Sequence, residues 1–280
     1  MKPYKIALIG VRHAALIAAG IVTSFPFVWM VLSSLKTKEE IWRFPPSLLP
    51  DTPVWSNFAE AWNAAPFGLY LFNSVFVASV IVVLQLVNSA MAGYALTHMK
   101  FPFRRALLGV ILASYMLPVA ATYLPGYIIL SNLGLLDSYA GLIFSNSVSV
   151  FSIFLARQAF QQLPRELAEA AKIDGAPHWR ILWTILVPLT RSSFVIMGLL
   201  TFIAQYNNYF WPMLITKSPE LQLVSAGLRS FFIEGGAYGM KWPLVMAGST
   251  FTILPLLALF VLAQRWIMKG VSNAFGVNKG

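Results

Sequence analysis

Six stretches of the sequence are long and apolar enough to cross a lipid bilayer, and they constrain the fold more than any other feature. A helical span needs about 20 mostly apolar residues. The stretches lie at approximately residues 14–35, 69–96, 106–130, 139–155, 188–215 and 243–263. One stretch alone could be an amphipathic helix of a soluble protein, but six together favour a membrane protein. We therefore predict an all-α integral membrane protein with six transmembrane helices in one domain over residues 1–280.

The composition agrees with lipid as the main solvent of this chain. Hydrophobic residues make up 58% of the sequence and charged residues only 11%, whereas a soluble domain carries about 25% charged residues. The chain has no cysteine, so it forms neither a disulfide framework nor a thiolate metal site.

The basic residues predict the orientation of the spans. With the N-terminus inside, 14 of the 20 Lys and Arg residues fall on inside segments and six on outside segments. Cytoplasmic loops carry such an excess, so we expect both termini in the cytoplasm. The net charge of +10 is then a signal of topology, and no nucleic-acid partner is expected.

Two features within this plan concern shape rather than chemistry. Trp55, Phe58 and Trp62 have helical spacing on the outside segment 36–67, which predicts a short helix in the headgroup layer, with an irregular loop as the alternative. Prolines kink helices. Here the kinks either shape a transport pathway or serve only the packing of the helix bundle. The prolines within the predicted spans are Pro26, Pro118, Pro125, Pro212 and Pro255.

Several classes of function lack the residues that they need. The predicted spans hold almost no ionisable side chain, which argues against proton coupling, although sodium coupling through carbonyl and hydroxyl oxygens stays open. His13, His98 and His178 are scattered without zinc-ligand spacing. No phosphate-binding loop is present, so if ATP drives this protein, another subunit binds it.

The most informative segment is the inside loop 156–187. Arg165–Asp174 is rich in Ala and Glu and follows Pro164, which predicts a short helix. Gly175 suits the left-handed cap of that helix, and Pro177 suits the first turn of a second helix. These residues alone leave two interpretations open, a docking element for another protein and a solvated connector.

The same loop resembles the signature motif of the permease subunits of ATP-binding-cassette importers. That motif is Glu-Ala-Ala, three residues, Gly, nine residues, Ile, one residue, Leu-Pro, and Val187 here replaces the usual Leu. The matching residues, in register, are Glu169, Ala170, Ala171, Gly175, Ile185 and Pro188.

The resemblance implies a function and a set of partners. The loop would form coupling helices that receive motion from an ATPase subunit, with Glu169, Ala170, Ala171, Asp174 and Gly175 at that contact. It implies a second permease subunit, two ATPase subunits that bind ATP and magnesium, and an extracytoplasmic substrate-binding protein. This chain would be no enzyme, hold no cofactor or metal of its own, and lie in a bacterial cell membrane.

Dispersed segments are similar to the carbohydrate uptake branch of this family, and within it to the smaller permease subunit of maltose and glycerol-3-phosphate systems. They imply import of a sugar or sugar-like solute. Import of glycerol-3-phosphate or a related phosphorylated polyol is the alternative, and a stand-alone secondary transporter is a weaker one. The segments are Ser33–Thr37, Phe72–Ser74, Leu136–Leu142, Ile173–Ala176 and Tyr206–Pro212.

Polar and aromatic residues in the fifth stretch are candidates for the wall of a solute pathway, because sugars are held by amides and aromatic faces. On one continuous helix Asn207 and Trp211 would share a face. Helix-to-helix hydrogen bonding and anchoring at the membrane surface are the alternatives. The candidates are Gln205, Tyr206, Asn207, Asn208 and Trp211, with Tyr115, Tyr123 and Asn146 as weaker ones.

The sequence says less about the outside segments and the C-terminal tail. The outside segments 36–67 and 216–242 are expected to receive the substrate-binding protein, and the tail 271–280 either reaches the ATPase or is solvated.

Overall fold

The computed structural model describes residues 3–233 and 241–274, and these residues form helices and connecting turns without a strand. Parts of the outside segment 216–242 and of the tail 271–280 therefore lie outside the described residues. The chain divides into two compact units. The first contains Met1–Gly68 and Gly227–Leu254, and the second contains Leu69–Ala226 and Pro255–Gly280.

The first unit is built around a short helix that the sequence predicts. Helix α3 (Ser56–Ala64) confirms the helical spacing of Phe58 and Trp62, with Trp55 directly before its first residue. Its buried Ala61 packs against the first turns of α16 (Trp242–Ala274). Phe251 of α16 lies between the rings of Phe58 and Trp62, with centroids 5.7 and 5.1 Å away. The unit also contains α1 (Pro3–Ser34), α2 (Lys38–Ile41) and the end of α14 (Val224–Ile233).

A carboxylate organises the connection between α1 and α3. Glu40 accepts hydrogen bonds from the backbone N–H groups of Thr37 and Asp51. These donors favour the ionised form, so they hold the pKa of Glu40 below its usual range. The Asn57 side chain donates to the carbonyls of Ser34 and Lys36, which ties α3 to the end of α1.

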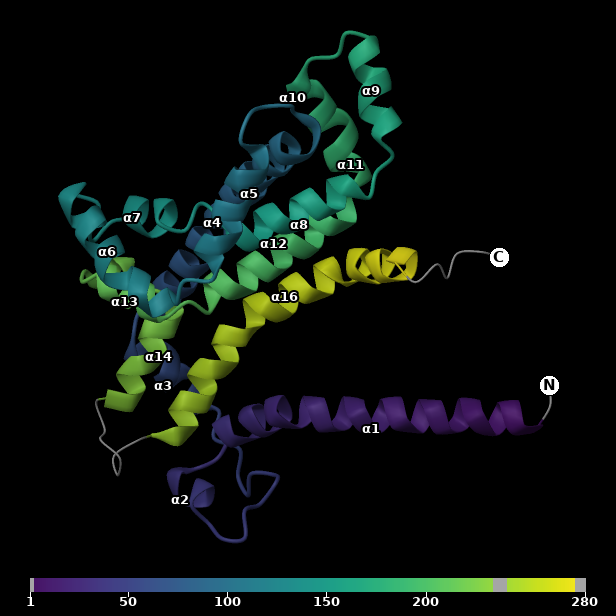
Figure 1. Ribbon diagram of the computed structural model, residues 1–280. Coiled ribbons are helices and arrows are strands. Elements are labelled where there is room, and N and C mark those ends of the chain that lie inside the picture. The colour runs from purple at the N-terminus through teal and green to yellow at the C-terminus, as the bar shows by residue number, and fades with distance from the viewer. Residues whose placement is uncertain (1–2, 234–240, 275–280) are drawn as a thin grey trace. The chain divides into compact units, whose positions relative to one another are not determined.

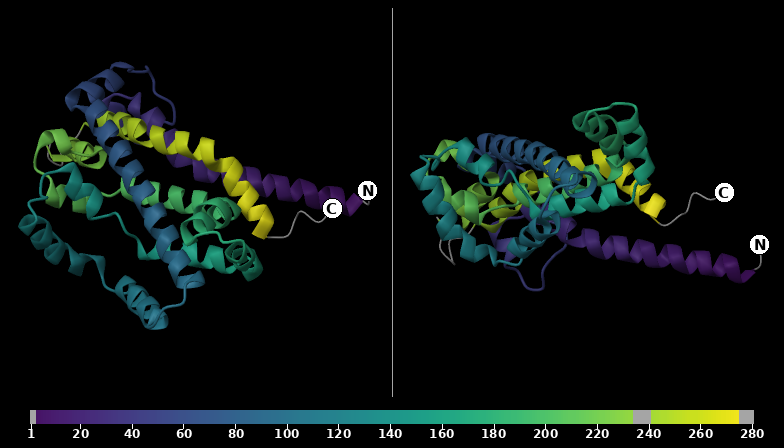
Figure 2. Two further views of the ribbon diagram at one scale, coloured as in Figure 1. Left: turned by 90° about the horizontal axis from the view of Figure 1, so that it is seen from above. Right: turned by 45° about the horizontal axis from the view of Figure 1, so that its top comes forward.

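The second unit contains most of α4 (Phe67–His98), the helices between α4 and α14, and the part of α16 from Pro255 onward (Figure 1). α8 and α12 pack along each other, and α9 and α10 extend beyond their ends as a hairpin, which is also visible in the right view of Figure 2. The helices are α5 (Arg104–Tyr115), α6 (Val119–Asn132), α7 (Tyr139–Phe144), α8 (Val150–Gln161), α9 (Arg165–Ile173), α10 (His178–Arg180), α11 (Val187–Leu189), α12 (Arg191–Tyr206) and α13 (Phe210–Ile215), with a π-helix at Ile181–Leu186 and a 3₁₀ turn at Pro219–Leu221.

Three described helices are long and apolar enough to cross a membrane, namely Ile9–Ser34, Phe67–His98 and Trp242–Trp266. They coincide with the first, second and sixth predicted stretches. Two bent helix pairs raise the number of candidate spans to five if each pair counts as one span. The six-helix count stays a prediction, because the stretch 139–155 contains no helix of spanning length.

Two helix pairs are sharply bent. The first bend divides the predicted stretch 106–130 at Pro118, where the sequence predicts a kink, and the second lies at the start of the predicted stretch 188–215. α5 and α6 meet at 102°, where Leu117 precedes Pro118. Proline lacks an N–H and disfavours helical backbone in the residue before it. α11 and α12 meet at 84° around Thr190. The carbonyl of Leu186 accepts hydrogen bonds from both the N–H and the hydroxyl of Thr190.

The fourth predicted stretch is divided for a different reason. α7 ends at Phe144 and α8 begins at Val150, because polar side chains between them bond to nearby backbone. Ser149 accepts a hydrogen bond from the N–H of Ser152 and caps α8. The hydroxyl of Ser147 donates to the carbonyl of Phe144. Such local bonds compete with the helix and end it.

A glycine sets the distance between α4 and α8. A Cβ on Gly93 would lie 3.0 Å from the backbone nitrogen of Arg157 and 3.1 Å from the Cβ of Ala156. Small residues allow this close approach of two helix backbones in membranes. Next to it lies the main buried cluster, which includes Tyr94, Phe160, Ile181, Leu186 and Phe194.

Replacing Gly93 with valine should separate α4 from α8 and destabilise the second unit by about 1–3 kcal/mol, the usual cost of overpacking. Thermal unfolding of the purified protein in detergent measures the loss. Gly109→Val is the matched control, because a Cβ at Gly109 meets no atom within 4 Å. Equal melting temperatures for the two variants would contradict the close contact.

Candidate functional site

The loop between α8 and α12 has the helix–turn–helix form that its sequence predicts. α9 begins after Pro164, and the backbone of Gly175 is left-handed with φ of +78°. The N–H of Ala176 donates to the carbonyl of Ala171 at 2.9 Å, and the N–H of Gly175 to that of Lys172 at 3.0 Å. These two bonds form a Schellman motif, which fixes the direction in which the chain leaves α9.

The alanines of the loop have different surroundings. Ala168 is buried, and Ala171 and Ala176 pack beside it against the main cluster of the second unit. Ala170, Glu169 and Asp174 are exposed. Of the predicted coupling residues, Ala171 therefore positions the hairpin, whereas the other side chains and the Gly175 turn are open to a partner.

Large apolar side chains are exposed on the same hairpin. Ile173 is 87% exposed and Trp179 is 65% exposed. Leu167 lies on α9 and is also exposed. Exposed apolar residues grouped with polar neighbours are typical of a protein-binding surface. We refer to Leu167, Glu169, Ala170, Ile173, Asp174 and Trp179 as the coupling surface.

Two contacts join the hairpin to the end of α4. The buried hydroxyl of Tyr94 lies 2.6 Å from Nδ1 of His178. The Lys172 ammonium donates to the carbonyl of His98 at 3.3 Å. Sequence reasoning missed these contacts, because they join residues 84 and 74 positions apart. A displacement of the hairpin would therefore be transmitted to α4.

Four of the predicted pathway residues line one cavity of about 460 Å³ in the second unit. They are Tyr123, Asn146, Asn208 and Trp211. Among the described residues, no charged side chain lines this cavity, and Thr122 and Ser145 contribute further hydroxyl groups. We refer to it as the polar cavity.

Trp211 forms a wall of the polar cavity and is itself largely buried. Its indole Nε1 donates to the Ser145 hydroxyl at 2.9 Å, and its ring stacks on Tyr123 at 5.8 Å. A Cβ on Gly126 would lie 2.9 Å from the indole, so this glycine provides the space for the ring.

The Asn208 amide is available to a solute. Its side chain lines the cavity and forms no hydrogen bond within the part of the chain that the structure describes, although its backbone carbonyl accepts from Ser225. Asn146 differs, because its amide donates to the carbonyl of Leu142 and to the Ser145 hydroxyl.

The remaining pathway candidates lie elsewhere. The expectation that Asn207 and Trp211 share a helix face is wrong, because α12 ends at Tyr206 and α13 begins at Phe210. Asn207 is exposed, and its amide donates to the carbonyl of Ile203. Neither it nor the half-buried Gln205 lines the polar cavity.

Two aromatic candidates also lie outside the polar cavity. Tyr206 is buried and stacks on Phe202. Tyr115 is 64% exposed at the end of α5.

Two amides of α4 brace the cavity, and sequence reasoning missed both. Gln85 donates to the carbonyl of Asn146 at 2.7 Å and accepts from the Thr201 hydroxyl. Asn88, one turn further, donates to the carbonyl of Ser147 at 3.0 Å. These carbonyls lie in the break between α7 and α8, where no helix satisfies them. A signal was present in the sequence, since an amide within an apolar span is costly without a partner.

A carboxylate fixes the connection after α13. Asp137 accepts from the backbone N–H groups of Lys217 and Ser218 at 2.8 and 2.9 Å, and the Ser218 hydroxyl also donates to it. These hydrogen bonds, that of the hydroxyl first, lower the pKa of Asp137. The stability that they give is present above the usual pKa of the group and is lost as the pH falls through the lowered value.

Among the described residues, no group of three or more His, Cys, Asp or Glu side chains could hold a metal ion.

Comparison with known protein families shows to which family this chain belongs. Residues 85–273, which include both the hairpin and the polar cavity, match the family described as binding-protein-dependent transport system inner membrane component. The chain belongs to this permease family.

Curated relatives of the permease are similar over almost the whole chain. It is 36% identical to the sn-glycerol-3-phosphate transport system permease protein UgpE of Yersinia enterocolitica, over 94% of this chain and 95% of the relative. It is 33% identical to the protein of the same name from Agrobacterium fabrum, over 93% and 95%. Both relatives are named as permease proteins of a transport system.

Two solved structures share the fold. One is the crystal structure of a bacterial ABC transporter for import of the acidic polysaccharide alginate, with a TM-score of 0.81, 22% identity and coverage of 95% of this permease and 98% of that chain. The other is a bacterial alginate ABC transporter in complex with its periplasmic protein, with a TM-score of 0.63, 13% identity and coverage of 94% and 96%.

Replacing Gln85 with leucine should destabilise the permease by about 1–3 kcal/mol, because the Asn146 carbonyl loses its donor in an apolar environment. Thermal unfolding in detergent measures the effect. Gln162→Leu makes the same chemical change at an exposed position and should leave the melting temperature unchanged. A stable Gln85→Leu variant would show that the break does not need this brace.

Proposed function

We propose that this permease is the transmembrane subunit of an ATP-driven importer for a sugar or a sugar-like solute, and that it converts closure of an ATPase into alternating access. The coupling surface on the α9–α10 hairpin carries this proposal most directly. It combines the family motif with exposed apolar side chains and a firm connection to α4.

The proposal assigns the energy source to partner subunits. Two ATPase subunits bind ATP and magnesium and hydrolyse ATP, while this chain supplies no catalytic group and no cofactor site of its own. Glu169, Ala170 and Asp174 contact the ATPase, and Gly175 sets the angle of the contact. Ala171 keeps α9 against the main cluster.

The remaining subunits follow from the same assembly. A second permease subunit completes the pathway, and an extracytoplasmic binding protein delivers the solute to the outside segments 36–67 and 216–242. The chain crosses a bacterial inner membrane six times with both termini in the cytoplasm. The excess of basic residues on the inside segments supports this orientation. The α7–α8 pair is the fourth crossing, held together by Gln85 and Asn88.

The polar cavity supports an uncharged, hydroxyl-rich solute. Its lining combines the free amide of Asn208 with hydroxyl groups and the Tyr123 ring, which are suited to sugars. A stand-alone secondary transporter is a poorer candidate, because membership of the permease family implies an ATPase partner.

Import of glycerol-3-phosphate or a related phosphorylated polyol is the second candidate, since two curated relatives carry that name. None of the described residues that line the polar cavity is cationic, so this lining favours a sugar over a phosphate compound. Thermal shifts of the cognate binding protein with sugars and with glycerol-3-phosphate distinguish the two candidates.

Glu169→Lys should abolish uptake of radiolabelled solute, because it reverses a charge on the coupling surface. Gly175→Pro should do the same, because proline cannot adopt the φ of +78° at this turn. Membrane insertion, measured by immunoblotting of membranes, should stay normal for both. Glu166→Lys is the matched control on the same helix outside the motif. Normal uptake by both motif variants would exclude the coupling role.

Asn208→Ala should reduce uptake about fivefold at low solute concentration, the factor equivalent to ~1 kcal/mol for one lost hydrogen bond. The neighbouring Asn207→Ala removes the same amide outside the cavity and should have little effect. ATPase co-purification checks that both variants assemble. If only Asn207→Ala impairs uptake, the polar cavity is not the solute pathway.

A further inference from the structure

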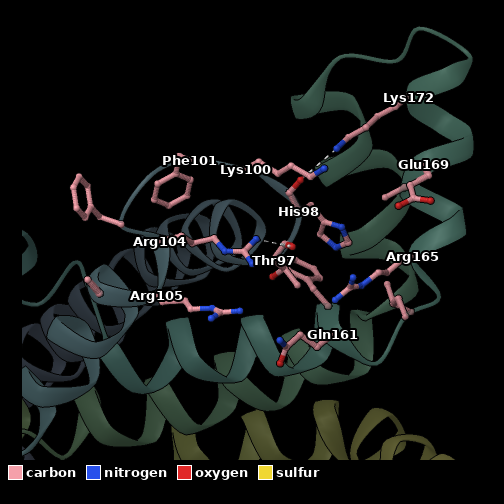
Figure 3. Close-up of a pocket in the computed structure, with 15 residues that line it drawn as sticks. Thr97, His98, Lys100, Phe101, Arg104, Arg105, Gln161, Arg165, Glu169 and Lys172 are labelled. Atoms are coloured by element: carbon pink, nitrogen blue, oxygen red, sulfur yellow. Dashed lines mark hydrogen bonds between the residues drawn. The ribbon is translucent and has the colours of Figure 1, made fainter.

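A second and larger pocket, of about 1070 Å³, lies beside α9 in the second unit. The end of α4, the connection from α4 to α5, the start of α5, the end of α8 and α9 all contribute to it. Glu169 of the family motif is one of its lining residues, but neither the motif nor the solute pathway accounts for the basic residues that line it. We refer to it as the basic pocket (Figure 3).

The lining of the basic pocket is strongly cationic. It contains five basic side chains and a single carboxylate, that of Glu169, which gives a formal charge of +4 with histidine neutral. In Figure 3, Arg105 and Arg165 extend toward the middle of the pocket from opposite sides. The basic residues are Lys100, Arg104, Arg105, Arg165 and Lys172.

Two of these cations have a structural role. Arg104 donates to the carbonyl of Met99 at 3.1 Å, and Lys172 donates to the carbonyl of His98. Both satisfy carbonyls at the C-terminal end of α4, where cations are favourable. Structural needs of the helix therefore explain them without a ligand.

The other three cations have no such explanation. Lys100, Arg105 and Arg165 form neither a hydrogen bond nor an ion pair through their side chains within residues 3–233 and 241–274. Like charges gathered in one pocket repel each other. A bound anion would remove that repulsion and gain several charge-assisted hydrogen bonds.

Two further features lie at the same pocket. The first three residues of α5 line it, and that helix end has neither a side-chain cap nor an acidic residue in its first turn. Free N–H groups at a helix N-terminus favour anions. The Nε2 atom of His98, another lining residue, is buried and has no hydrogen-bond partner among the residues that the structure describes.

We propose that the basic pocket binds a phosphate group, carried either by the headgroup of an anionic phospholipid or by a soluble phosphate compound. A phosphate offers several acceptor oxygens, which suit the forked donors of Arg105 and Arg165. Exposed Phe101 and Phe103 on the rim resemble the aromatic residues of a membrane interface. Basic pockets between membrane helices hold lipid headgroups in this way.

Binding at this position has a mechanical consequence. Arg165 belongs to α9, whereas Lys100 and Arg105 belong to the α4–α5 connection and to α5. One phosphate would link these elements and hold the coupling hairpin against α4. The site is independent of the solute, so it does not depend on which substrate the importer takes.

The test uses the full chain, delipidated in detergent, and two probes. Inorganic phosphate is titrated at constant ionic strength, and phosphatidylcholine vesicles are supplied with or without phosphatidylglycerol. Thermal unfolding reports binding of each probe. The double variant Lys100→Gln/Arg105→Gln should bind the effective probe roughly tenfold more weakly than the unmodified protein, because it loses two charge-assisted contacts.

The matched control is Arg180→Gln/Arg191→Gln, which removes the same charge from exposed positions outside the pocket and should bind like the unmodified protein. Stabilisation by phosphatidylglycerol alone identifies a lipid headgroup, and stabilisation by inorganic phosphate identifies a soluble compound. If the double variant does not fold, Arg165→Gln serves in its place. The proposal is wrong if neither probe stabilises the unmodified protein, or if the pocket variant responds as the control does.

Discussion

Backbone groups inside an apolar medium must find hydrogen-bond partners within the protein, and this requirement governs the second unit of the permease. Long helices meet it by themselves. Where the chain leaves the helix between α7 and α8, Gln85 and Asn88 donate to the freed carbonyls of Asn146 and Ser147. The polar cavity lies beside this break, so the same interruption that requires bracing also creates room for a solute.

The α9–α10 hairpin, α4 and the polar cavity form one connected structure. Ala168 packs the hairpin against the main cluster, and Tyr94 and His178 join it to α4. The same helix α4 carries Gln85, which braces the break beside the cavity, about two and a half turns before Tyr94. A movement imposed on the hairpin by an ATPase therefore has a direct route through a rigid helix to the residues proposed to meet the solute.

The sequence predicts those parts of the structure that depend on nearby residues. α9 and the turn at Gly175 follow from Pro164, the helix-forming residues and one glycine, all within a short segment. The proline at residue 118 predicts a kink but not a bend of 102°, and the bend at Thr190 escapes prediction because hydropathy measures only apolar content and not the direction of a helix. The cavity escapes it too, since Asn208 and Asn146 come together only through the packing of distant helices.

The turn at Gly175 has a consequence for how such importers can exchange partners. Its shape is determined by backbone hydrogen bonds and by the absence of one Cβ, and no surface side chain takes part. Leu167, Ile173 and Trp179 can therefore be replaced during evolution without changing the angle of the hairpin. A permease with such a turn can become specific for a different ATPase subunit while the angle of its hairpin is preserved.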